Sequence, residues 1–168
     1  LRFIEQASDD SSVQLDLVEA FRALAQIETY SGNVGLALEQ ANEAYEIAQS
    51  LFELDSQNAR YKTTLIEALL SLSNAQQNSA LEDDGLASAQ SAIKYATELN
   101  AVGKRNLDTL ELYDAARSNL LSALSAAGVI ESNEELYLAL ISSYQKRLEK
   151  QPDNEKIRLQ LAQVQIQL

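Results

Sequence analysis

Three consecutive carboxylates, Glu82, Asp83 and Asp84, are the side chains whose type and spacing come closest to a chemical site. Carboxylate oxygens are preferred Ca²⁺ ligands, but the ligands of an EF-hand loop alternate along the chain, and adjacent acids lack that spacing. Acids at the start of a helix can cap it and interact favourably with its N-terminal dipole. We therefore expect these residues to open a helix, and we expect no metal or cofactor site.

The sequence lacks the residues on which most catalytic sites depend. It contains no His and no Cys, so the usual general base and the thiol nucleophile are both missing. It also contains no glycine-rich phosphate loop and no Gly-x-Ser-x-Gly elbow. Paired carboxylates can act as acid and base when two of them converge in a cleft. The sequence does not show such a pair, and scattered carboxylates are expected in a chain this acidic. We expect the chain to be non-catalytic, although a parent protein could contain a kinase or another catalytic domain.

The charge balance narrows the range of partners. The chain has 25 acidic and 13 basic residues, a net charge of −12. Phosphate recognition relies on Lys and Arg, so we expect neither nucleic acid nor an anionic membrane surface as a partner. No apolar run approaches the roughly 18 residues of a membrane-spanning helix, so we expect no membrane insertion. The absence of Cys does not identify a compartment, and a cytoplasmic location is only slightly favoured.

The composition predicts an all-α fold. The 168 residues include 5 Gly and 1 Pro, too few turn residues for a many-stranded β fold. Strong helix formers fill every segment, and the length is sufficient for one domain with a substantial core. The chain does not begin with Met, so we expect it to be a fragment of a longer protein.

An antiparallel helical hairpin is predicted around the turn at 31–33, with helices over 12–30 and 34–54. After the turn, small residues form one stripe at helical spacing: Ala37, Ala41, Ala44 and Ala48, continued by Leu51. A small stripe lets the backbone of a partner helix approach closely, and bulky residues of the first helix fill the remaining space.

Eight residues around this turn resemble the signature of the tetratricopeptide repeat (TPR): Phe21, Leu24, Ala25, Gly32, Ala37, Leu38, Ala41 and Ala44. The resemblance implies an α-α superhelix of stacked antiparallel hairpins, in which stability comes from stacking. The Pro expected near the end of the second helix is missing, so we expect longer helices than in the standard repeat. Extended repeats of this kind resemble TPR regions of large bacterial signalling proteins, such as receptor-like serine/threonine kinases and transcription regulators.

The repeat unit is estimated at 44–48 residues. Asn58, Asn106 and Asn154 are spaced by 48, whereas the pattern at 21–25 recurs at 65–69, after 44. We expect a single domain over 1–168, with about seven long helices and a short N-terminal one. Its expected parts are the end of a truncated repeat (1–10), three hairpins (11–57, 58–105 and 106–152) and a terminal helix (153–168).

The resemblance implies a concave groove, lined by the first helix of each hairpin, that binds a peptide or a partner helix. The register of those helices selects ten candidate groove residues: Glu19, Arg22, Gln26, Tyr30, Thr63, Glu67, Leu70, Asn74, Asp114 and Arg117. Chaperone-binding TPR domains hold a C-terminal carboxylate with Lys and Asn. Here Arg22 and Gln26 occupy comparable places, but Glu67 stands where Asn is expected, which argues against such a clamp.

Other interpretations remain open at this stage. Each groove candidate could simply be a solvated side chain, and Glu39, Glu43 and Glu46 could form either a solvated outer face or a ridge for a basic partner. The main alternative function is a structural spacer or a self-association module. Terminal half-repeats would leave apolar faces exposed, and exposed stacking faces support homo-oligomers.

Overall fold

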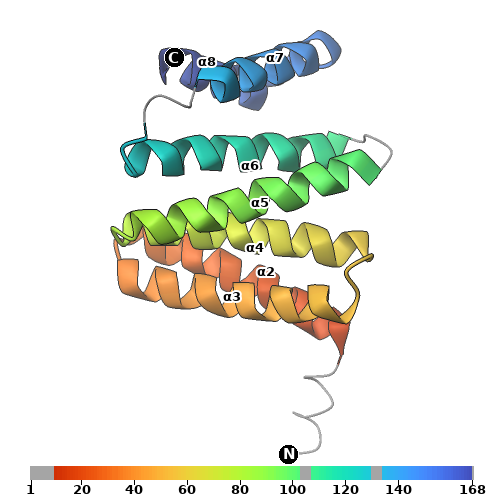
Figure 1. The fold of residues 1–168 in the computed structure, drawn as a ribbon, viewed down its shortest axis with the longest axis vertical. Helices are drawn as coiled ribbons and strands as arrows, with labels where there is room; N and C mark the ends of the chain where they lie inside the picture. The colour runs from red at the N-terminus through yellow and green to blue at the C-terminus, as the bar shows by residue number, and fades with distance from the viewer. Residues whose placement is uncertain (1–9, 103–106, 130–133, 168) are drawn as a thin grey trace, which may run out of the picture.

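The computed structural model describes residues 10–102, 107–129 and 134–167. These residues form an all-α fold without strands, as the composition predicted (Figure 1). The described helices are α2 (Ser11–Tyr30), α3 (Val34–Leu54), α4 (Ala59–Asn78), α5 (Glu82–Val102), α6 (Leu107–Ala126), α7 (Glu134–Lys150) and α8 (Glu155–Gln167). The short helix expected near the N-terminus and the expected cap at Asn106 lie outside the described residues.

The helices recur at a constant interval of 48 residues. Helices α2, α4, α6 and α8 begin at positions 11, 59, 107 and 155, and helices α3, α5 and α7 end at 54, 102 and 150. The interval of 44 between the patterns at 21–25 and 65–69 is therefore not the repeat length. Four residues are about one helical turn, so a pattern matched one turn out of register still looks similar.

The turns recur at the same interval as the helices. Helices α2, α4 and α8 each start directly after an Asp or Asn residue. The side-chain oxygen of that residue accepts a hydrogen bond from a backbone N–H in the first turn of the helix. These bonds are Ser12 to Asp10 at 2.8 Å, Arg60 to Asn58 at 3.0 Å and Ile157 to Asn154 at 3.2 Å. A cap of this kind stabilises a helix by about 1 kcal/mol, so it fixes where α2, α4 and α8 begin.

The first helices end in a second recurring turn. The second residue after each of these helices has a left-handed backbone: Gly32 (φ 78°), Ala80 (φ 56°) and Gly128 (φ 71°). The next amide then donates to a carbonyl five residues back, as in the 2.9 Å bond from Leu81 to Gln76. Glycine adopts this conformation freely, whereas for Ala80 it costs about 1 kcal/mol.

The helices stack along the long axis of the molecule, from α2 and α3 at one end to α7 and α8 at the other (Figure 1). Consecutive helices pack against each other, consistent with a superhelix of helical hairpins. Helix α2 also lies close to α4, and α4 to α6, whereas the backbones of α3 and α5 lie further apart and these two helices meet through the edge-to-face pair of Phe52 and Tyr95, with ring centroids 5.2 Å apart. Because neighbours lie closer in the layer of α2, α4 and α6, the stack curves with that layer on its inner side.

The small stripe of α3 is the centre of the first hairpin's core. Ala37, Ala41, Ala44, Ala48 and Leu51 are each at most 1% exposed. Ala44 and Ala48 pack with Val18 of α2 and with Leu65 and Ile66 of α4, so one stripe joins two hairpins. A separate cluster joins α6, α7 and α8, and burial there raises the pKa of the Tyr144 phenol to about 12.

Candidate functional site

A hollow of about 550 Å³ lies on the inner layer, between α2 and α4, with one wall residue from α6. It brings together seven of the ten candidate groove residues: Glu19, Arg22, Gln26, Tyr30, Glu67, Leu70 and Asn74. Its remaining lining residues are Ala23, Ala25, Thr29, Ser71, Gln77, Asn78 and Ser122. The lining is therefore mostly amides and hydroxyls, with few apolar side chains.

The other three candidates lie elsewhere. Thr63 is half-buried on α4 and does not line the hollow. Asp114 is only 2% exposed, because it faces α7, and it lines a second hollow of about 370 Å³ together with Arg22, Glu67 and Leu70. Arg117 lies over the Tyr113 ring, 4.2 Å from Cζ to the ring centroid, and donates to the Tyr113 hydroxyl at 2.9 Å.

A register error of one residue explains the misplacement on α6. At the interval of 48, the counterparts of Glu67, Leu70 and Asn74 are Ala115, Ser118 and Ser122. Ala115 and Ser118 each lie one residue after a candidate, Asp114 and Arg117 respectively. One residue rotates a side chain by about 100° around a helix, which is enough to move it from the inner surface into the core.

Seven lining residues are not among the ten candidates, including Ser71, Gln77, Asn78 and Ser122. The same interval would have found them. Gln26, Asn74 and Ser122 are counterparts in three successive repeats, and Thr29 corresponds to Gln77. The signal was present in the sequence, but it becomes usable only once the repeat length is fixed at 48.

Polar contacts connect the helices along the inner layer. Arg22 Nη1 lies 2.6 Å from Glu67 Oε2, Asn119 donates to Asn74 at 2.7 Å, and Ser122 donates to Gln77 at 2.8 Å. Each contact joins residues 45 apart on neighbouring first helices. The ion pair is about one-third exposed, so it contributes little stability, but it neutralises the one cation of the hollow.

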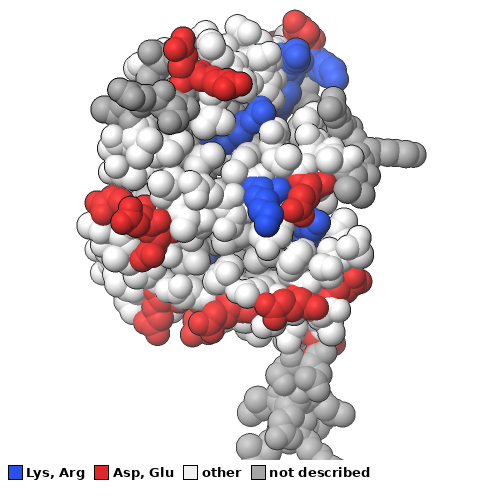
Figure 2. All heavy atoms as spheres, in the orientation of Figure 1, with Lys and Arg blue, Asp and Glu red and all other residues white. Residues whose placement is uncertain are grey.

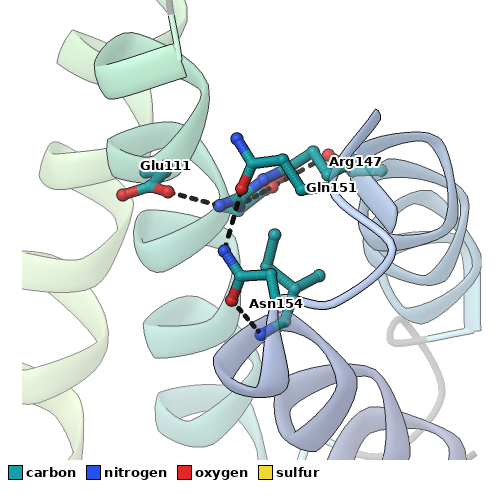
Figure 3. Close-up of polar contacts among 7 residues, drawn as sticks. Glu111, Arg147, Gln151 and Asn154 are labelled. Carbon is teal, nitrogen blue, oxygen red and sulfur yellow. Dashed lines mark hydrogen bonds and ion pairs between the residues drawn. The ribbon is translucent and has the colours of Figure 1, made fainter. Parts of the chain in front are cut away.

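A second polar cluster joins α6 to α7 (Figure 3). The Arg147 guanidinium contacts Asp114 Oδ2 at 3.1 Å and Glu111 Oε1 at 2.6 Å, and Ser143 donates to Asp114 at 2.8 Å. Figure 3 shows Glu111 extending from α6 towards Arg147, with Gln151 and Asn154 beyond it in the turn that leads to α8. Burial raises the pKa of the Asp114 carboxyl, although Ser143 and Arg147 act in the opposite direction.

This cluster replaces apolar contacts of the earlier repeats. The counterparts of Asp114 are Val18 and Ile66, both 0% exposed. The counterparts of Arg147 are Leu51 and Leu99, and those of Ser143 are Ile47 and Tyr95. Three core positions have thus become polar together, so the third repeat holds α6 and α7 by a buried ion pair where the earlier repeats use aliphatic packing.

Neither a scan against protein-family models nor a search of curated proteins found a match for this chain. Among the described residues, no group of three or more His, Cys, Asp or Glu side chains is arranged to hold a metal ion. No helix in the described ranges is long and apolar enough to cross a membrane. The case for a function therefore depends on the hollow and on the surfaces at the two ends of the stack.

Proposed function

We propose that this chain is a non-catalytic, TPR-like scaffold that binds an extended peptide in the hollow between α2 and α4. It would serve as the interaction module of a larger bacterial signalling protein. The observation that carries the proposal is the lining of the hollow, where polar side chains from three helices of the inner layer face one open space.

The chemistry of the lining favours an extended peptide over a partner helix. Gln26 and Asn78 each carry an amide that can both donate and accept a hydrogen bond, and Asn74 and Gln77 carry two more, which already bond to Asn119, Ser122 and Ser73. A peptide backbone in extended form offers the matching N–H and C=O groups, whereas the backbone of a helix is already paired internally. A partner helix would instead need a largely apolar groove for its side chains, and Leu70 is the only large aliphatic residue in the lining.

The proposal can be tested by selecting peptides from a random library against the whole chain and measuring their affinity for two matched variants. The groove variant is Gln26→Ala with Asn78→Ala. The control is Asn42→Ala with Gln49→Ala on α3, which lies in the outer layer. Losing two hydrogen bonds of about 1 kcal/mol each should weaken binding roughly thirtyfold in the groove variant and leave the control unchanged.

Two outcomes would contradict the proposal. One is a library that yields no peptide above background on the wild-type chain. The other is a set of peptides that bind both variants as tightly as the wild type, which would place their site outside the hollow. Melting temperatures measured in parallel separate lost binding from lost folding, since all four substituted residues lie on helices.

A further inference from the structure

Helix α2 exposes an apolar face that its counterparts bury. Leu17, Leu24 and Ile27, called here the head face, are 42%, 43% and 57% exposed. Their counterparts on α4, Leu65, Leu72 and Ala75, are at most 4% exposed, because α4 packs there against α2 and α3. The head face is therefore the surface by which a repeat stacks on the repeat before it, and no described residue covers it in α2.

The other end of the stack also carries an apolar stripe. Leu159, Ala162 and Ile166, called here the tail stripe, follow one side of α8, and Leu159 and Ile166 are 62% and 85% exposed. The counterparts of Ala162 are Val18, Ile66 and Asp114, which are buried, whereas those of Ile166 are Arg22, Leu70 and Ser118, so the stripe reaches from the stacking side of α8 to its inner-layer side. The opposite side of α8 already packs on α7 through Ile157 and Val164.

The two ends differ in charge. Residues 10–57 include nine acidic residues and one basic residue, whereas residues 146–158 include five basic and three acidic residues. On the face shown in Figure 2, Asp and Glu gather along the lower edge, over α3, whereas Lys and Arg lie at mid-height and above, with Asp and Glu also present there. Lys146, Lys150 and Lys156 are exposed, so they are available to an acidic partner surface.

We propose that copies of this chain associate head to tail, with the head face of one copy packed on the tail stripe of the next. Both surfaces are apolar, and the charges around them are of opposite sign, so this orientation is attractive. Two heads facing each other would instead bring two acidic hairpins together, and two tails would bring basic ends together. The contact joins two different surfaces, so it is heterologous and can extend from copy to copy.

The test is sedimentation velocity of the whole chain over about 1 µM to 1 mM, the affinity range of weak interfaces. The average mass should rise with concentration for the wild type and stay monomeric for the head variant Ile27→Glu and the tail variant Ile166→Glu. The control is Leu138→Glu, since Leu138 is 50% exposed and its counterparts Asn42 and Gln90 are exposed polar residues. It should associate like the wild type.

An equimolar mixture of head and tail variants gives the most specific readout. Each variant retains the surface that the other has lost, so the mixture should form a dimer and nothing larger. A wild-type chain that stays monomeric throughout, association lost in only one of the two variants, or a mixture that stays monomeric would each overturn the proposal. Should a Glu variant fold poorly, Leu24→Ser and Leu159→Ser test the same two surfaces with a milder change.

Discussion

Replacing Asp114 with Ile, or Arg147 with Leu, should destabilise the protein strongly, whereas making both changes together should not. The Arg147 side chain is 9% exposed and the Asp114 side chain 2%, so each is the buried partner of the other, and without Asp114 the Arg147 guanidinium keeps only the half-exposed Glu111. Removing one partner of a buried pair typically costs about 3–5 kcal/mol. The loss should be smaller for Arg147→Leu, because the remaining carboxyl can take up a proton, which its raised pKa already favours.

The double substitution introduces the residues that the preceding repeat has at these two positions, Ile66 and Leu99, and leaves Ser143 half-buried without its Asp114 acceptor. Its stability should lie within about 1 kcal/mol of the wild type or above it, because apolar replacements of buried ion pairs are often neutral or stabilising. Glu111 loses its partner, but its side chain is 49% exposed and stays hydrated. If the two single changes were independent, the double variant would lose about 6 kcal/mol or more of unfolding free energy. Nearly all of that sum should therefore appear as coupling energy, the difference between the summed single losses and the loss in the double variant.

The assay is urea denaturation of the wild type, both single variants and the double variant, followed by far-ultraviolet circular dichroism. A double variant as unstable as the sum of the singles would refute the reasoning, because the two side chains would then not act as one unit. Single losses below about 1 kcal/mol would refute it as well, since they would mean that water already reaches the pair.

Two further expectations concern single sites. Ala80→Gly should stabilise the protein by about 0.5–1 kcal/mol, because Gly occupies the equivalent left-handed positions 32 and 128; an unchanged or lower denaturation midpoint would contradict this. The raised pKa of Asp114 means that the folded chain binds its proton more readily than the unfolded chain, so this carboxyl favours folding increasingly as the pH falls from neutral towards its ordinary value of 3.8. The stability of the wild type relative to Asp114→Asn should therefore rise as the pH falls from neutral towards 3.8, and a difference that stays constant over that range would contradict the raised pKa.

The helix boundaries could be predicted closely because local side chains determine them. The expected helix over 12–30 is observed as Ser11–Tyr30, and the expected helix over 34–54 is observed as Val34–Leu54. The signals at the ends of α2 are an Asp cap and a left-handed Gly, and both act within a few residues. Such signals are readable without knowledge of the tertiary contacts.

The position of the groove residues on α6 could not be predicted in the same way. This helix has apolar residues around much of its circumference, including Leu110, Tyr113, Leu120, Leu121 and Leu124, so its buried side is ambiguous. The carboxylate of Asp114 also suggests a solvent-facing residue, and its partner lies 33 positions further along the chain. The packing of α6 against α7 shows that this position belongs to the core, as the 48-residue interval also indicates by aligning Asp114 with Val18 and Ile66.

The pattern of helix contacts has a consequence for how the chain folds. Within the described residues, no helix touches another that is more than two helices away in sequence. Every loop that must close is therefore short, which favours rapid folding that can start in any hairpin and spread to its neighbours. Amide hydrogen exchange should then vary along the stack, with the outermost helices opening often while the amides of α4 and α5 stay protected for far longer.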